Sequence, residues 1–171
     1  VFVCPECSTE VVFWDAAVHN NIVHNEFSCP TCSSVLGKRR MERAWNNSFD
    51  SALRTTVRRA KQTPVLINYS VPGLPSRFEK RPEVFDLSLL QKIADTPIPH
   101  YYPTDRMAEG HETRRNDPIG ITHVHHFYTH RNLYIMACLN EKTSSSKLPT
   151  MRFGFLNTAW HATQMRQFNP G

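Results

Sequence analysis

Two Cys-x-x-Cys pairs near the amino terminus constrain this chain more than any other feature. They are Cys4-Pro5-Glu6-Cys7 and Cys29-Pro30-Thr31-Cys32, and 21 residues separate them. Two residues between cysteines allow a tight turn to direct both thiols at one ion, and two such turns complete a tetrahedral site. The spacing therefore predicts a structural zinc ion held by Cys4, Cys7, Cys29 and Cys32. Such a site is closed, so we expect it to stabilise the fold and to do no chemistry.

Disulfides and redox chemistry are the alternative explanations for these cysteines. Two disulfides would leave a fifth cysteine, Cys138, unpaired, and no secretory signal is recognisable in the sequence. A thioredoxin-like motif occurs once beside a βαβ pattern, whereas this motif occurs twice. The cysteine content thus favours a reducing, cytoplasmic setting. No apolar run approaches the roughly 18 residues that span a bilayer, so we expect no membrane partner.

Short β-prone runs flank the cysteine pairs at residues 1–3, 10–14 and 26–28. Separated by turns, they predict a small antiparallel sheet with the metal at one end, as in a zinc ribbon. A sheet of this size buries little apolar surface, so the ion would supply much of the folding free energy. We expect an α+β fold, with a zinc ribbon at residues 1–37 packed on a mixed α/β segment of two or three helices at residues 38–171.

Several elements are predicted after the ribbon. The apolar run 64–71, closed by Pro72-Gly73, indicates a buried strand. Asp86 is expected to be the N-cap of a helix that extends to residue 94 and buries Leu89, Leu90 and Ile93 on one face. Residues 38–47 could continue as a strand or start a helix, and we favour a strand. Residues 51–61 fit either a helix or a strand, because helical spacing of apolar residues coincides with β-branched side chains.

The carboxyl-terminal half is expected to contain a long polar loop and two helices. The loop covers residues 99–118, and a loop of that length is uncommon unless it is functional or mobile. Thr129 is the predicted N-cap of a helix that runs to about residue 142. Pro149 is expected to open the last helix. The first of these helices is expected to bury Leu133, Met136, Ala137 and Cys138. The last helix is expected to bury Phe155, Ala159, Ala162 and Met165, and to end at Asn169-Pro170-Gly171.

Positive charge is concentrated in one part of the chain. Residues 38–61 contain eight Lys or Arg residues and two acidic residues, which gives a local net charge of +6 in a chain whose total net charge is +5. These basic side chains could simply form a solvated surface. Alternatively, they could contact nucleic-acid phosphates, and the neighbouring zinc ribbon favours this second explanation. The candidate DNA contacts are Lys38, Arg39, Arg40, Arg43, Arg54, Arg58, Arg59 and Lys61, with a second cluster of Arg106, Arg114 and Arg115 in the long loop.

Four histidines lie close together in the segment 121–130. In an extended chain His123 and His125 would share a face, and an acid such as Asp105, Glu109 or Asp117 could complete a metal site. That arrangement would suit a metal-dependent nuclease or hydrolase. Packing and phosphate contact are the alternative roles for these histidines.

The chain starts without Met, inside a cysteine knuckle, which we interpret as a segment of a longer protein. Several stretches carry a resemblance that covers nearly the whole chain. Besides the two cysteine pairs, they are 64–70, Pro103-Thr104-Asp105-Arg106-Met107, Arg114-Arg115-Asn116-Asp117 and Gly120-Ile121-Thr122-His123-Val124-His125-His126-Phe127. With these stretches the chain resembles the central region of a family of bacterial DNA methyltransferases that contain a zinc ribbon. Members of that family transfer a methyl group from S-adenosylmethionine to an amino group of a DNA base, typically adenine.

The family's catalytic Asp/Asn-Pro-Pro-Tyr/Phe motif is absent, since Asn116-Asp117-Pro118-Ile119 has a different form. The glycine-rich loop that binds S-adenosylmethionine in the family is absent too. The resemblance therefore implies a DNA-binding or target-recognition module, which is not catalytic by itself, beside a catalytic methyltransferase domain in the parent chain. A structural scaffold that braces this catalytic domain is the alternative.

Overall fold

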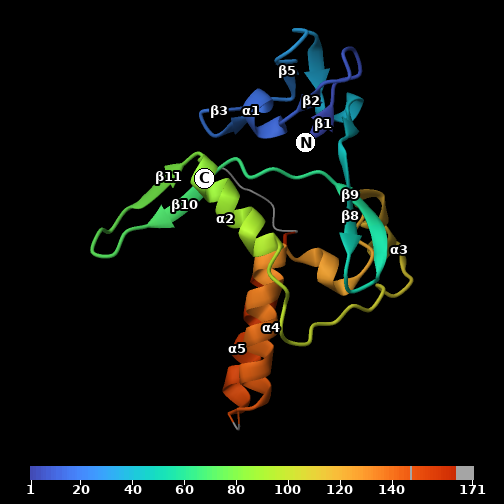
Figure 1. Cartoon of the computed structure of the whole chain (residues 1–171). Coiled ribbons are helices and arrows are strands. Elements are labelled where there is room, and N and C mark those ends of the chain that lie inside the picture. Colours follow the sequence, from blue (N-terminus) through green and yellow to red (C-terminus); the bar gives the residue numbers. More distant parts are fainter. Residues whose placement is uncertain (147, 165–171) are drawn as a thin grey trace. The chain divides into compact units, whose positions relative to one another are not determined.

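The computed structural model describes residues 1–146 and 148–164 (Figure 1). The chain divides into two compact units. Of the described residues, the first contains Val1–Phe49 and Thr56–Val84, and the second contains Asp50–Thr55 and Phe85 to Gln164. The predicted ribbon segment, residues 1–37, lies wholly within the first unit. The described residues form five α-helices and small sheets of two or three strands, so the fold is mixed α/β as expected.

Short antiparallel strands surround the cysteines in the first unit. A three-stranded sheet has the order β2-β1-β7, in which Phe2 of the central strand lies opposite Val11 on one side and Arg43 on the other. Two further strand pairs, β3 with β4 and β5 with β6, complete this part. The bounds are β1 (Phe2–Val3), β2 (Glu10–Val11), β3 (Val18–His19), β4 (Ile22–Val23), β5 (Glu26–Ser28), β6 (Val35–Gly37) and β7 (Glu42–Arg43).

A helix replaces part of the β-prone run 10–14. Only Glu10–Val11 is a strand, and α1 (Phe13–Ala17) follows it. The helix turns the Phe13 ring onto two other aromatic rings, with centroids 5.9 Å from Phe2 and 5.6 Å from Phe27. Tertiary packing of these rings thus decides the conformation of a short segment whose local preference was for a strand. The buried core around them consists of Phe2, Cys4, Val11, Ala17, Phe27, Cys29, Leu36 and Met41.

Two hairpins follow in the chain, and the first decides a segment that the sequence left open. Residues 38–47 were expected to be a strand, but they begin with the 3₁₀-helix η1 (Lys38–Arg40) before β7 and β8 (Trp45–Asp50). The undecided segment 51–61 contains the strand β9 (Thr55–Ala60), which pairs with β8. Its β-branched residues therefore prevailed over the helical spacing.

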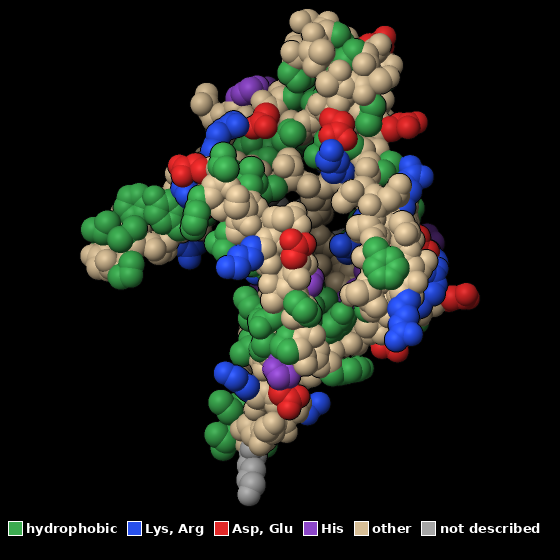
Figure 2. All heavy atoms as spheres, viewed as in Figure 1, with side chains coloured by type: hydrophobic (Ala, Val, Ile, Leu, Met, Phe, Trp, Pro, Cys, Tyr) green, Lys and Arg blue, Asp and Glu red, His purple; other side chains and the backbone are tan. Residues whose placement is uncertain are grey.

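The run 64–71 forms a strand, β10 (Ile67–Ser70), that pairs with β11 (Arg77–Lys80), but it is not buried. Tyr69 is 41 % exposed and the flanking Val71 is 38 % exposed. The prediction of a buried strand is wrong, because a two-stranded hairpin covers neither face of an apolar run. Figure 2 shows hydrophobic side chains gathered over this hairpin.

Helices dominate the second unit. The long polar loop of the prediction contains a short helix and a 3₁₀ turn, and Arg106 within it forms an isolated antiparallel bridge with His123. Figure 1 shows α4 and α5 packed side by side. The bounds are α2 (Val84–Ala94), α3 (His111–Arg114), η2 (Asp117–Ile119), η3 (Val124–Phe127), α4 (His130–Ser144) and α5 (Pro149–His161).

The helix signals at Thr129 and Pro149 are confirmed. The Thr129 side chain accepts a hydrogen bond from the Asn132 amide, and α4 buries Leu133, Met136 and Ala137. Pro149 opens α5, which ends at His161 rather than at the predicted stop. Met165 and residues 169–171 of that prediction lie outside the described residues.

The helix predicted from Asp86 is present but begins earlier, at Val84, and its predicted apolar face is not buried. Leu89 is 46 % exposed and Leu90 is 36 % exposed. Local signals identified this helix correctly, whereas burial depends on neighbouring segments. Within the described residues no helix combines the length and the apolarity needed to cross a bilayer.

Candidate functional site

The four predicted cysteines lie together at one end of the first unit. The Sγ atoms of Cys4 and Cys32 are 3.8 Å apart, as are those of Cys7 and Cys29. Sulfurs bound to one ion at about 2.3 Å in a tetrahedron are separated by about 3.8 Å, so the spacing fits a single four-coordinate metal ion. All four thiols are free, with no disulfide among them. The prediction that these cysteines form one group able to bind a metal is confirmed.

The first cysteine knuckle has a defined backbone. The amide of Ser8 donates to the carbonyl of Cys4 at 2.9 Å, and the amide of Cys4 donates to the carbonyl of Thr9 at 2.9 Å. Ser8 has a positive φ of 59°, in the left-handed region. This conformation reverses the chain immediately after Cys7, so that both sulfurs of the pair face the same point.

The second knuckle repeats the first at every corresponding position. Ser33 donates to the carbonyl of Cys29 at 3.0 Å, and Cys29 donates to the carbonyl of Ser34 at 2.8 Å. Ser33 also has a positive φ, of 61°. The two cysteine pairs have therefore adopted the same turn, although their sequences differ. A single ion with tetrahedral coordination requires such a turn from both pairs. The serine that follows each cysteine pair is the sequence signal for this turn, and the prediction from spacing alone did not include it.

Hydrogen bonds prepare part of this group for metal binding. At Cys4, burial raises the thiol pKa, but the amides of Cys7 and Glu6 outweigh burial and lower the pKa to about 6. At Cys32, hydrogen bonds from the side chain and backbone of Ser34 lower the pKa. The thiolate is the metal-binding form of cysteine, so these contacts favour the ligand state. At Cys29 the amide of Cys32 lowers the pKa, yet burial and neighbouring thiols outweigh it and the pKa rises.

Most of the predicted DNA contacts between residues 38 and 61 are exposed. Arg59 and Lys61 are half-buried, and Lys61 forms an ion pair with Glu10 at 2.6 Å. Lys38 lies over the Phe13 ring at 5.2 Å and Arg43 over the Phe2 ring at 5.6 Å. The six fully exposed members are Lys38, Arg39, Arg40, Arg43, Arg54 and Arg58.

One face of the β8–β9 hairpin combines aromatic and basic side chains. The guanidinium of Arg58 lies 4.4 Å from the ring centroid of Trp45. Because side chains alternate along a strand, Phe49 projects from the same face of β8 as Trp45. Phe49 is 69 % exposed. Trp45 is half-buried, whereas Phe49 and Arg58 are exposed. We call these three residues the hairpin face.

The second basic cluster is tied into its own loop. Arg114 pairs with Asp117 at 3.1 Å and donates to the carbonyl of Met107 at 2.6 Å. Arg106 approaches Asp117 at 3.7 Å. Arg115 pairs with Glu112 at 2.8 Å. These contacts give Arg114 in particular a role in ordering the long loop, and DNA contact by this cluster stays a prediction.

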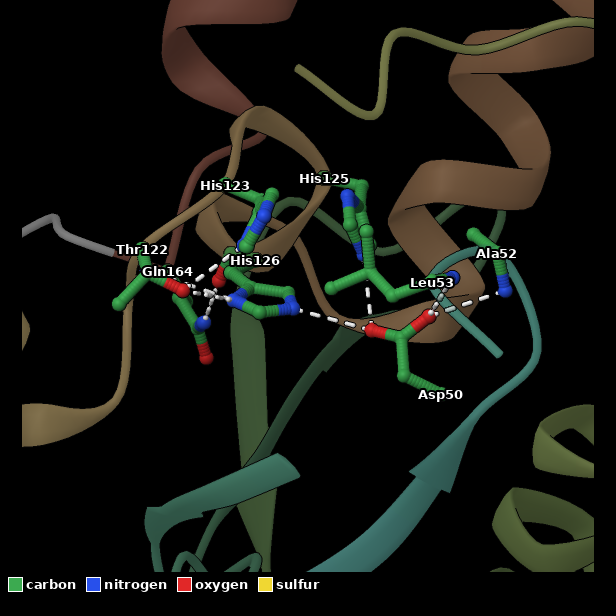
Figure 3. Close-up of polar contacts among 8 residues, drawn as sticks. All are labelled: Asp50, Ala52, Leu53, Thr122, His123, His125, His126 and Gln164. Carbon is green, nitrogen blue, oxygen red and sulfur yellow. Dashed lines mark hydrogen bonds and ion pairs between the residues drawn. The ribbon is translucent and has the colours of Figure 1, made fainter. Parts of the chain in front are cut away.

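A second group of possible metal ligands lies in the second unit (Figure 3). His125 Nε2 is 2.9 Å and His126 Nε2 is 3.0 Å from the same atom, Asp50 Oδ2. The other oxygen, Asp50 Oδ1, accepts hydrogen bonds from the amides of Ala52 and Leu53 at 3.0 and 3.1 Å. The two histidines are 7 % and 1 % exposed, so the group is shielded from solvent.

The structure assigns different partners to the histidines than the sequence predicted. His123 does not join His125 at a common acid; its Nδ1 contacts the Thr122 hydroxyl at 2.8 Å. Asp117, one of the expected acids, pairs with arginines instead. In the described part of the chain, the groups of three or more close enough to share an ion are the four cysteines and the group of Asp50, His125 and His126. Asp50 was not among the predicted ligands, because it lies 75 residues before His125 and no motif spacing connects the two.

Electrostatics in this group follow from its burial and hydrogen bonds. Burial raises the carboxyl pKa of Asp50, but hydrogen bonds from His125 and His126 outweigh burial and lower it to about 2. Burial lowers the pKa of His123, and the neighbouring His125 and Arg106 lower it further. Burial raises the pKa of Tyr102, whose ring lies 6.1 Å from that of His125. Asp50 is therefore an anion at neutral pH, beside two imidazoles.

Comparison with known protein families, with curated proteins and with solved structures finds no match to this chain.

Proposed function

We propose that this chain is a DNA-binding module in which a structural zinc ion is held by the four cysteines. The observation that carries the proposal is the hairpin face, where the Arg58 guanidinium lies over Trp45 and the Phe49 ring is exposed further along the same strand. Proteins that bind single-stranded or distorted nucleic acid combine positive charge for the backbone with aromatic rings on which bases stack. The hairpin face presents both kinds of group from one β-hairpin.

The remaining exposed basic residues support the same proposal. Lys38, Arg39, Arg40 and Arg43 directly precede the hairpin in the chain and belong to the same unit. Side chains of this kind neutralise phosphates and release counterions, which gives affinity without reading sequence. Zinc suits the cysteine cluster, because a four-thiolate tetrahedron is its usual structural site.

The proposed parent is an S-adenosylmethionine-dependent DNA methyltransferase, on the sequence resemblance alone. In that protein a separate catalytic domain would bind S-adenosylmethionine and extrude the target base before methyl transfer. The present chain would hold the DNA beside that domain. No catalytic residue and no cofactor-binding residue is proposed within it.

DNA affinity measured across a salt series tests the proposal. We expect binding at low salt that weakens as salt rises, and Arg58→Glu to reduce affinity about tenfold or more, because it reverses a charge at the centre of the hairpin face. Arg77→Glu is the matched control, since Arg77 is also exposed on a hairpin strand of the same unit. Binding that is undetectable at low salt, or equally weakened by both substitutions, would contradict the proposal.

A scaffold that braces the catalytic domain is the second candidate function. Several large apolar side chains of α5 are exposed, among them Phe153 at 76 %, Leu156 at 61 % and Trp160 at 76 %. Exposed apolar residues in such number are typical of surfaces that another polypeptide covers. Charge reversal at Arg58 and Arg59 separates the two candidates. Lost DNA affinity with intact association supports DNA binding, whereas lost association with the catalytic domain supports the scaffold.

A further inference from the structure

We propose that Asp50, His125 and His126 form a second metal site, distinct from the cysteine cluster. The ion would be a divalent first-row transition metal bound by Asp50 Oδ2 and by the Nε2 atoms of both histidines. The inference is independent of DNA binding, because none of these residues belongs to the hairpin face. It rests on the convergence of three ligand atoms that lie within 4.8 Å of one another.

The distances within the group suit ligands of one ion. Nitrogen and oxygen ligands bind such metals at about 2.1 Å, and two ligands at right angles are then about 3.0 Å apart. The two Nε2 atoms lie 2.9 and 3.0 Å from Asp50 Oδ2. A small outward shift of the carboxylate would open the wider angles of a tetrahedral site.

Surrounding contacts orient the ligands. Asp50 Oδ1 is occupied by two backbone amides at the tip of the β8–β9 hairpin, which leaves Oδ2 directed at the histidines. Thr122 contacts the far nitrogen of the His126 ring, with its amide at 3.3 Å and its hydroxyl at 3.5 Å from Nδ1. Metal sites in proteins use such outer contacts to fix carboxylate and imidazole ligands.

Protonation makes this site weaker than the cysteine site. Without metal, each Nε2 is the donor of a hydrogen bond to the ionised Asp50 Oδ2 and therefore carries a proton. With metal, that proton must move to Nδ1, where Thr122 Oγ1 is the acceptor nearest to the His126 ring. The Thr122 amide favours the opposite tautomer, because it donates to Nδ1. Metal therefore competes with an existing hydrogen-bond network, and a mild chelator should remove this ion first.

The donor set and its burial indicate which metals bind and what they do. Two imidazoles and one carboxylate suit Zn²⁺, Co²⁺, Fe²⁺, Mn²⁺ or Ni²⁺ rather than the hard Ca²⁺ or the soft Cu⁺. The ion would join the hairpin tip to η3 across 75 residues of sequence. Its role would be to cross-link the second unit.

Metal counting on the tag-free full chain, equilibrated with excess Co²⁺ and freed of unbound metal, tests this site. We expect two ions per chain, one for each group of ligands. The thiolate site should give intense charge-transfer absorption in the near ultraviolet, and the second site only weak visible bands. One ion per chain in the unsubstituted protein would overturn the proposal, whatever the variants do.

Two variants locate the second ion. His126→Ala should reduce the count to one ion while the thiolate absorption persists, which also reports that the first unit is folded. His123→Ala is the matched control, since His123 is a neighbouring histidine outside the group, and it should retain two ions. Two ions in His126→Ala, or one in His123→Ala, would overturn the assignment.

Discussion

At the scale of single residues, Phe13 connects most of the first unit's aromatic core. Its ring lies 5.9 Å from Phe2 and 5.6 Å from Phe27, the latter edge-on. The ammonium of Lys38 lies 5.2 Å from the same ring. Aromatic pairs in these geometries contribute roughly 0.5–1.5 kcal/mol beyond their buried area. Removal of this one ring should therefore loosen α1 from the strands β1 and β5, whose Phe2 and Phe27 contact it.

We expect Phe13→Ala to lower the free energy of unfolding by about 2–3 kcal/mol, somewhat less than a fully buried phenylalanine, because the ring is half-buried. Chemical denaturation of the metal-loaded protein measures the change. Phe49→Ala is the control, since Phe49 is 69 % exposed, and it should change stability by less than about 0.5 kcal/mol. Equal effects of the two substitutions would show that Phe13 is not a core residue.

At the scale of elements, the two knuckles depend on a serine in the left-handed region. Ser8 and Ser33 have φ values of 59° and 61°, which strain any side chain and β-branched ones most. The strain is tolerated because the reversed chain aligns the sulfurs. At α1 the local preference was for a strand, but tertiary packing of the Phe13 ring produced a helix instead.

Ser33→Val should lower stability by more than about 1 kcal/mol and weaken metal binding, because valine is poorly accommodated at positive φ. Competition with a coloured chelator measures metal affinity. Ser28→Val is the matched control: Ser28 is exposed in the strand β5, where valine is favoured. Ser33→Gly should leave metal affinity unchanged. A tolerant Ser33→Val variant would mean that this turn is not required for metal binding.

At the scale of the whole molecule, the two units depend on different interactions. The first has a core in which Cys4 and Cys29 are 0 % and 1 % exposed, so its packing surrounds the thiolate site. The second has a core built on α4, with Leu133, Met136 and Ala137 buried. Loss of the thiolate metal should therefore affect the units unequally.

We expect Cys4→Ser to abolish metal binding at the cysteine cluster and to unfold the first unit, while α4 and α5 persist. Hydrogen exchange of backbone amides, read by mass spectrometry, resolves the two units. Cys138→Ser is the control, because Cys138 lies in α4 outside the cluster. Unchanged protection of residues 1–49 in Cys4→Ser would contradict a structural role for the metal.

The sequence by itself determined features that depend on a few neighbouring residues. The spacing of the cysteine pairs predicted the grouping of four thiols, and Thr129 and Pro149 marked the starts of α4 and α5. These signals are local, because two intervening residues, a capping side chain or a fixed φ act within one turn of the chain.

Only the tertiary structure decided which segments are covered and which distant side chains meet. The run 64–71 and the leucines of α2 read as buried but are exposed, because burial depends on what packs against a segment. Asp50 meets His125 and His126 across 75 residues, and no spacing in the sequence encodes that contact. Local order follows from adjacent residues, whereas burial and convergence are properties of the folded chain as a whole.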